Sequence, residues 1–226
     1  MGGSHRRAHL VLMTVTLTGF MGCGKSSAGK ALANRLGWEF VDLDEYIEHK
    51  KGWSIEEIFA NEGEEAFRAV EAECVRDIII MNQIAGGDVV LALGGGTMIT
   101  TSVQWLILEQ TECFWLKASL PTCMERIASS DKKRPLLDGQ TDVRELFAER
   151  EKFYSQTAKV VDTEGLDVNE VANELLRRIS TPLNNLIIGK LRGESYEPSL
   201  SASKAMQSRN SLIISYRILQ GPHGKG

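Results

Sequence analysis

Eight consecutive residues near the start of the chain have the types and spacing of a phosphate-binding loop. They read Gly19-Phe20-Met21-Gly22-Cys23-Gly24-Lys25-Ser26 and match GxxxxGK(S/T), between an apolar strand-like run and a helix-forming stretch. Glycines let successive backbone N–H groups point at phosphate oxygens, and the following helix adds its positive N-terminal end. Lys25 can reach the β and γ phosphates, and Ser26 can offer a hydroxyl to magnesium. The motif predicts a nucleotide site formed by Gly22, Cys23, Gly24, Lys25, Ser26 and Ser27.

Two acidic residues after the next strand-like run could hold a metal and a substrate. A phosphate-binding loop needs a further acidic group for its metal. The run Val89–Leu93 ends in glycines, so the candidates are Asp42 and Asp44. Carboxylates at i and i+2 of a strand project from the same side, and parallel strands end beside the loop. We expect the two acids to divide the metal and a substrate hydroxyl between them; the alternative is a solvated turn in which Asp44 caps the next helix.

Alternating short and long apolar patterns predict the elements that position these residues. Between Leu10 and Ser180, β-branched or aromatic runs alternate with amphipathic stretches, which is typical of βαβ units around a parallel sheet. The predicted strands are Val11–Thr18, Glu39–Leu43, Val89–Leu93, Cys113–Lys117 and Lys159–Asp162. The predicted helices are Lys25–Leu36, Glu56–Asn82 with a break near Gly63, Ser102–Glu109, Leu120–Ser129, Val143–Gln156, and Val168–Ile179 with Asp167 as its N-cap.

Composition excludes several other classes of protein. With 226 residues and a formal net charge of -4, the chain has no basic excess for nucleic acid and no apolar run of the ~18 residues that span a bilayer. Four cysteines without a CxxC pair favour a reducing cytoplasm, and scattered histidines give no zinc-ligand spacing. We therefore expect a cytoplasmic monomer that binds small molecules.

Both ends of the chain differ from the segment between them. Residues 1–9 are polar and basic and are expected to form an N-terminal extension. Residues 181–226 are expected to be a mostly disordered tail, because Leu191–Gly226 is rich in Ser, Gly and Pro and has one apolar cluster, Leu212–Ile214. A linker, tag or read-through sequence is one interpretation of this tail, and a regulatory or docking segment is the other.

Seven ordered motifs between residues 19 and 180 resemble those of the shikimate kinase family. They are Gly19–Ser26, Phe40–Asp44, Ile55–Phe59 with Gly63-Glu64, Phe67-Arg68 and Glu71, then Gly94-Gly95-Gly96, Arg134–Leu137, Arg150 with Tyr154, and Val161–Thr163. The resemblance implies transfer of phosphate from ATP to the 3-hydroxyl of shikimate, on the way to chorismate and the aromatic amino acids. It also implies an α/β, three-layer αβα P-loop kinase fold with a central parallel five-stranded sheet, over residues 10–180, and a mobile lid at about 129–140.

The resemblance also implies roles for individual residues. Lys25, Asp44 and Arg134 would be catalytic, with Arg134 on the lid beside the nucleotide, and Ser26 and Asp42 would hold Mg²⁺. Shikimate would be bound by Asp44, Arg68, Gly94, Gly95, Gly96 and Arg150. A clamp of two arginines independently suits the carboxylate of shikimate, because a guanidinium presents a fixed fork of donors.

Other interpretations remain for these residues. Arg68 by itself resembles one end of a surface ion pair with Glu64, and Asp131–Arg134 a solvated turn. Family members usually carry a further lid arginine upstream of Arg134, and Lys132 or Lys133 would have to replace it here. The alternative functions are another small-molecule P-loop kinase, acting on gluconate or a nucleoside monophosphate, and a catalytically silent ATP-binding protein. The paired arginines and the triple glycine argue against the first, and the presence of Lys25, Asp44 and Arg134 argues against the second.

Overall fold

The protein is built on a five-stranded parallel sheet. In this computed structural model, which describes residues 13–85, 87–129 and 142–179, the strand order is β2-β3-β1-β4-β5 and every neighbouring pair is parallel. The strands are β1 (Thr14–Thr18), β2 (Glu39–Asp42), β3 (Val89–Ala92), β4 (Glu112–Lys117) and β5 (Lys159–Asp162). The predicted sheet is confirmed. The predicted N-terminal extension, most of the lid and the tail lie outside the described residues.

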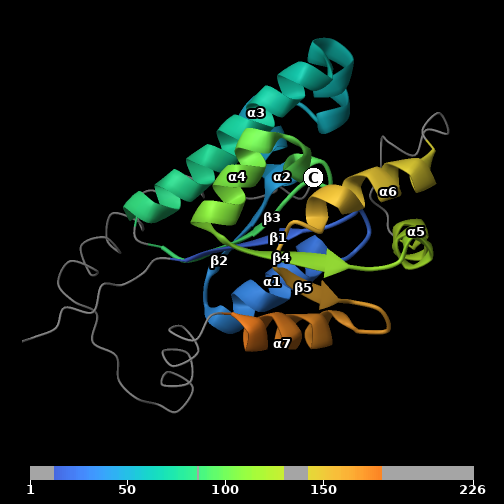
Figure 1. Cartoon of the computed structure of the whole chain (residues 1–226). Helices are drawn as coiled ribbons and strands as arrows, with labels where there is room; N and C mark the ends of the chain where they lie inside the picture. The colour runs from blue at the N-terminus through green and yellow to red at the C-terminus, as the bar shows by residue number, and fades with distance from the viewer. Residues whose placement is uncertain (1–12, 86, 130–141, 180–226) are drawn as a thin grey trace, which may run out of the picture.

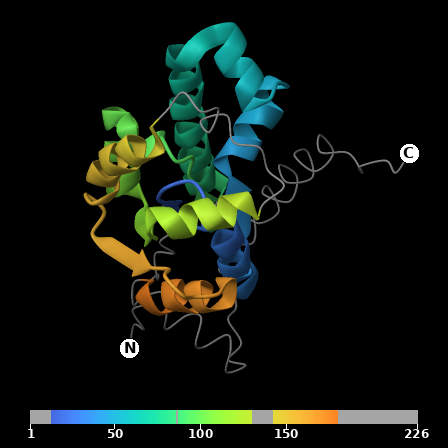
Figure 2. The same cartoon turned by 90° about the vertical axis from the view of Figure 1, so that its right-hand side faces the viewer.

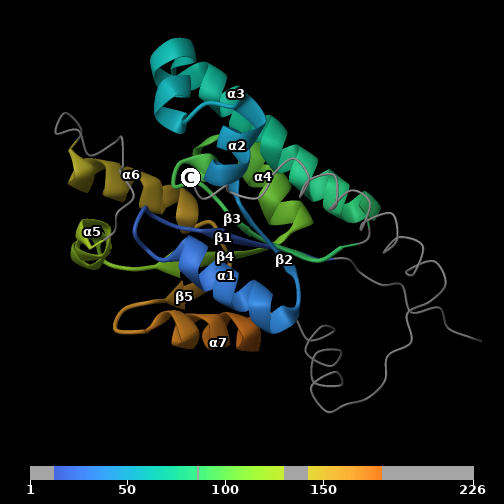
Figure 3. The same ribbon diagram turned by 180° about the vertical axis from the view of Figure 1, so that it is seen from behind.

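Helices cover both faces of the sheet and make three layers. Figure 1 shows α3 and α4 on one face and α1 and α7 on the other, and the view from behind in Figure 3 agrees. The helices are α1 (Lys25–Leu36), α2 (Leu43–Lys51), α3 (Ile55–Ala85), the short 3₁₀ helix η1 (Thr97–Ile99), α4 (Thr101–Gln110), α5 (Leu120–Ala128), α6 (Val143–Tyr154) and α7 (Val168–Arg178). This is the predicted αβα architecture.

The second strand is shorter than predicted and gives way at once to a helix that was not predicted. β2 ends at Asp42, whose carboxylate accepts from the backbone N–H of Asp44 at 3.1 Å and so caps α2. Leu43 and Ile47, four residues apart, are buried on one face of that helix. The expectation that Asp44 ends a strand is therefore wrong, as is the alternative that it is the cap: Asp44 lies in the first turn of α2.

Elsewhere, short sequence patterns were sufficient to predict where helices are interrupted and where they begin. The predicted break near Gly63 is confirmed, because α3 is interrupted there by a backbone with φ 82° and ψ 175°, which favours glycine. The predicted N-cap Asp167 is also confirmed: its side chain accepts from two backbone N–H groups of α7, and the side chain of Glu170 completes a capping box.

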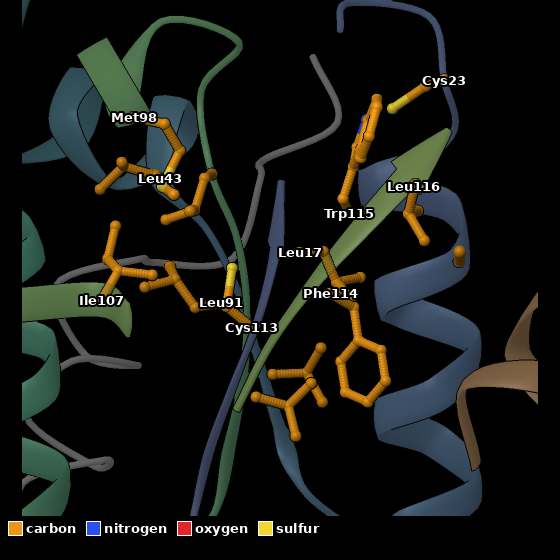
Figure 4. Packing of buried hydrophobic residues seen from close by; sticks show 14 of the residues in the cluster. Leu17, Cys23, Leu43, Leu91, Met98, Ile107, Cys113, Phe114, Trp115 and Leu116 are labelled. Carbon is orange, nitrogen blue, oxygen red and sulfur yellow. The ribbon is translucent and has the colours of Figure 1, made fainter. Parts of the chain in front are cut away.

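The hydrophobic core lies on both sides of the sheet. Figure 4 shows Leu43, Met98 and Ile107 packed on one side, while Phe114 and Leu116 lie on the side of α1. Runs of buried residues along a strand are expected where a parallel sheet is covered on both faces. The four cysteines are buried within this core and form no disulfide, and burial raises the pKa of the Cys74 and Cys113 thiols to about 11. Among the described residues, no helix has the length and hydropathy of a membrane span.

Candidate active site

The loop from β1 to α1 presents its backbone to an open cleft. Gly19 and Gly22 have φ of 141° and 79°, and a Cβ on either would lie within 2.5 Å of a backbone oxygen, of Leu116 and Cys123 respectively. Gly24 is the N-cap of α1, and this helix has no side-chain cap. Its N-terminal N–H groups therefore face the cleft as anion donors.

Two side chains of the loop already have polar partners. Lys25 Nζ donates to the carbonyl oxygens of Gly19 at 2.8 Å and Phe20 at 3.0 Å, so the ammonium lies folded over the loop. Ser26 Oγ donates to Asp42 Oδ2 at 2.5 Å. The structure thus brings together the hydroxyl and the carboxylate that were predicted to hold magnesium, and both are oxygen donors of the kind Mg²⁺ prefers.

The cleft has a volume of about 610 Å³ and extends from this loop toward the glycine turn after β3. Asp42, Asp44 and Gly95 line it on the side of the sheet. The opposite wall comes from the C-terminal end of α5, from the end of the segment that joins β5 to α7, and from the first turn of α7. It consists of Arg126, Ile127, Ser129, Leu166, Asp167, Val168 and Val171. Leu166 and Asp167, at the end of the connection from β5 to α7, therefore border the cleft.

The three glycines after β3 form a surface against which three polar side chains pack. A Cβ on Gly94 would lie 2.9 Å from Asp44 Oδ1. On Gly95 it would lie 3.1 Å from Arg150 Nη1, and on Gly96 only 2.6 Å from Arg68 Nη2. Side chains from α2, α3 and α6, which are distant in sequence, thus meet on one turn because that turn has no side chains of its own.

A buried carboxylate holds Arg68 in place. Arg68 Nη1 donates to Glu71 Oε2 at 2.8 Å, and its Nη2 lies 3.3 Å from Glu64 Oε1 on the surface. Glu71 is 1% exposed, and its other oxygen accepts from the hydroxyl of Thr97 at 2.7 Å. The surface pair with Glu64 therefore exists but is not the main contact. Sequence analysis placed Glu71 in a family motif without a role; its spacing of three residues from Arg68 on a helix was the available signal.

Arg150 is a buried cation with an unsatisfied donor. The residue is 4% exposed, and its Nε has no hydrogen-bond partner among the described residues. One turn later, Tyr154 donates its hydroxyl to the carbonyl oxygen of Gly95, and burial raises the pKa of that phenol, so it stays a neutral donor. An unpaired N–H on a buried charge is costly, so Arg150 indicates a site for an anionic ligand.

Arg126 on α5 is a further candidate residue that sequence analysis missed. Its guanidinium donates to the carbonyl oxygens of Cys23 at 3.3 Å and Thr163 at 3.0 Å, so it joins the phosphate-binding loop to the cleft's outer wall. Lys132 and Lys133, which were expected to replace the further lid arginine, lie outside the described residues, as does Arg134. The available signal was the position of Arg126 one turn after the buried Cys123, on a helix predicted to precede the lid.

A parallel five-stranded sheet of order 2-3-1-4-5, with a GxxxxGK(S/T) loop between β1 and α1, defines the class of P-loop kinases. Within that class, the family model "Shikimate kinase" matches residues 21–180. The chain therefore belongs to the shikimate kinase family, and it is an enzyme of the kinase type, as the resemblance implied.

Individual relatives agree with this family. A shikimate kinase of Moorella thermoacetica is 37% identical over 174 residues, which cover 76% of this chain and 97% of that protein. One of Thermus thermophilus is 41% identical over 168 residues, with 73% and 89% covered. The solved structure of the Acinetobacter baumannii shikimate kinase, in complex with shikimate, matches at 30% identity with a TM-score of 0.68, covering 77% of this chain and 95% of that one.

Proposed function

We propose that this protein transfers the γ-phosphoryl group of ATP to the 3-hydroxyl of shikimate, giving shikimate 3-phosphate and ADP, in the pathway to chorismate and the aromatic amino acids. The observation that carries the proposal is the buried Arg150, with its unpartnered Nε, beside Arg68 on the glycine turn. The two guanidinium groups pack against adjacent glycines, Gly95 and Gly96, and such a pair suits a carboxylate. The carboxylate of Asp44 packs against the same turn and lines the cleft.

Nucleotide binding is assigned to the phosphate-binding loop. Backbone N–H groups of residues 22–27 and the N-terminus of α1 would bind the phosphates, and Lys25 would exchange its bonds to loop carbonyls for bonds to phosphate oxygens. Ser26 and Asp42 would hold Mg²⁺. When bound, the ion supplies positive charge next to the transferring group.

Asp44 is the proposed base for the acceptor hydroxyl. Its Oδ1 lies against Gly94, between the cleft and the arginine pair, so a hydroxyl of a carboxylate-anchored substrate would come within its reach. Asp44 would orient that hydroxyl and accept its proton while the oxygen attacks the γ-phosphorus in line. Catalysis then depends on positioning and charge, without a covalent enzyme intermediate.

The remaining assignments extend this proposal beyond the described residues. A lid at about 129–140 would bring Arg134 to the transferring phosphoryl group and exclude water. The catalytic unit would be residues 10–180 of a single chain, which includes every motif of the family. A cytoplasmic location accords with four thiols that form no disulfide.

Acceptor choice tests the proposed function directly. ADP release is measured with ATP and Mg²⁺ in the presence of shikimate, gluconate, AMP or no acceptor. We expect rapid ADP release with shikimate only, together with formation of shikimate 3-phosphate. Faster turnover with gluconate or AMP would replace the proposed substrate, and ADP release that is the same with and without acceptors would contradict a phosphotransferase.

The lid assignment has its own measurement. In Arg134→Ala we expect kcat to fall and the ratio of ADP to shikimate 3-phosphate to rise above one, because a poorly sealed site admits water. Asp44→Asn is the matched comparison, since its ratio should stay near one. Equal ratios in the two variants would make Arg134 a fixed phosphate contact instead of a lid residue.

A further inference from the structure

The outer wall of the cleft consists of two parts. One is the last turn of α5 with Arg126, and the other is the segment from Leu166 to Val168 that leads into α7. Figure 2 shows α5 lying above α7, with the connection from β5 beside them. The separation of these two parts sets the width of the slot at the end of the cleft away from the glycine turn.

Glu164 ties the segment after β5 to the beginning of α5. Its carboxylate accepts from the backbone N–H of Ser119 at 2.6 Å and from the hydroxyl of Thr122 at 2.7 Å. Ser119 is the N-cap of α5, so the carboxylate lies at the positive end of that helix. These hydrogen bonds lower the pKa of Glu164 to about 2, and the group is therefore an anion throughout the neutral range.

The neighbouring Thr163 ties the same segment to the other end of α5. Arg126, in the last turn of that helix, donates to both the carbonyl and the hydroxyl oxygen of Thr163. Thr163 also bonds through its N–H and its hydroxyl to the carbonyl oxygen of Lys117, at the end of β4. Two consecutive residues thus hold α5 at both of its ends, and both are also bonded to the ends of strands: Thr163 to β4, and Glu164, through its N–H, to Asp162 of β5 at 3.0 Å.

We propose that Glu164 is a positioning residue for the nucleotide base: by holding the N-terminus of α5, it fixes the slot between Arg126 and the Leu166–Val168 segment. Glu164 does not line the cleft itself and acts through these residues. The inference rests on the proposed function only in assigning the phosphate end of the cleft to ATP. It predicts a residue whose loss weakens nucleotide binding and leaves the acceptor site, on the other side of the phosphate-binding loop, unchanged.

Binding of ADP and of pyrophosphate to the full chain separates this role from a general loss of structure. Both ligands occupy the phosphate-binding loop, but only ADP carries a base. In Glu164→Ala we expect the Kd of ADP, measured by titration calorimetry with Mg²⁺, to rise by roughly tenfold, about the factor given by 1.4 kcal/mol. The Kd of pyrophosphate and of shikimate should stay within about twofold of the wild type, and KM for ATP should rise while kcat holds.

Two further variants sharpen the test. Glu164→Gln can still accept from Ser119 and donate to the Thr122 hydroxyl, so we expect it to recover most of the ADP affinity. Glu174→Ala is the control, because Glu174 is a glutamate of α7 paired with Arg177 and Arg178 that makes no bond to α5. Its ADP affinity should equal that of the wild type.

A double-mutant cycle completes the experiment. Thr122→Val removes one of the two hydrogen bonds between Glu164 and α5 and is expected to raise the Kd of ADP by about threefold. In the double variant with Glu164→Ala, we expect little loss of ADP affinity beyond that of Glu164→Ala alone. If Glu164→Ala does not fold, Thr122→Val carries the test. Unchanged ADP affinity in a folded Glu164→Ala or Thr122→Val, or an equal loss for ADP and pyrophosphate in either, would overturn the positioning role. Because the ADP and pyrophosphate titrations contain no acceptor, failure to phosphorylate shikimate would contradict the proposed function without affecting their result.

Discussion

The two halves of the candidate active site are constructed in different ways. The phosphate half is eight consecutive residues and one helix N-terminus, and it would bind mainly through backbone N–H groups. The acceptor half is assembled from separate elements: Asp44, Arg68 and Arg150 come from three helices and meet on Gly94–Gly96. The phosphate half therefore depends on the conformation of one loop. The acceptor half depends on three glycines, whose lack of side chains leaves room for Asp44, Arg68 and Arg150.

Their polar groups also differ in how well they are satisfied without ligand. Lys25 is half-buried and has two carbonyl partners within the loop. Arg150 is buried, and its Nε has no hydrogen-bond partner in the part of the chain that the structure describes. Lys25 must exchange hydrogen bonds when a nucleotide binds, whereas Arg150 would gain one when an anion binds. We therefore expect substitutions in the acceptor half to act selectively on the acceptor.

The largest effect is expected at Asp44, where the two halves meet. Asp44→Asn keeps the shape but loses the base, so kcat should fall by roughly 10²–10⁴ while the Kd of ATP changes little. Steady-state kinetics and nucleotide titration measure the two quantities. Glu45→Gln, which alters the exposed neighbouring acid in the first turn of α2, is the control and should retain kcat. A fully active Asp44→Asn would remove Asp44 from the chemistry.

The second largest effect is expected when the buried cation, Arg150, is removed. Truncating one partner of a desolvated charge pair costs ~2–5 kcal/mol. Arg150→Ala should therefore weaken the binding of shikimate by at least about thirtyfold and leave the affinity for ATP unchanged. Arg144→Ala, at an exposed position of the same helix, serves as the matched control. Calorimetric titration with each substrate decides the matter, and an equal loss of ATP affinity would refute the assignment of Arg150 to the carboxylate.

A smaller effect is expected when only the space on the glycine turn is filled. In Gly96→Ala the new Cβ would lie 2.6 Å from Arg68 Nη2, so the guanidinium must move, at a cost of roughly 1–3 kcal/mol. Shikimate affinity should fall by about five- to a hundredfold, with ATP affinity unchanged. Gly37→Ala introduces a strained backbone at φ 66° in open space and should lower the melting temperature without changing either affinity. Normal shikimate binding by Gly96→Ala would show that Arg68 is not needed there.

The smallest effect is expected outside both halves. Deletion of Leu191–Gly226 should leave kcat and both KM values within about twofold, because all seven motifs and the closing helix α7 precede that boundary. The match to the shikimate kinase family model also ends at residue 180. A large fall in kcat for a truncated protein with an unchanged melting temperature would instead give the tail a functional role.

The sequence by itself determined the features that depend on neighbouring residues. The phosphate-binding loop, the five strands, the break at Gly63 and the cap at Asp167 were all predicted from short patterns, because each arises from local backbone preferences or local hydrogen bonds. The family was likewise identified from the order of such motifs along the chain.

Only the tertiary structure decided which distant groups share a space. A short apolar repeat did not reveal α2, so Asp44 was taken for a strand residue although it lies in the first turn of that helix. The support that Glu71 gives Arg68, the bridge made by Arg126 and the tie made by Glu164 depend on contacts between different elements or on burial. A charged residue in a sequence looks the same whether it faces water or a buried partner, and only packing decides between the two.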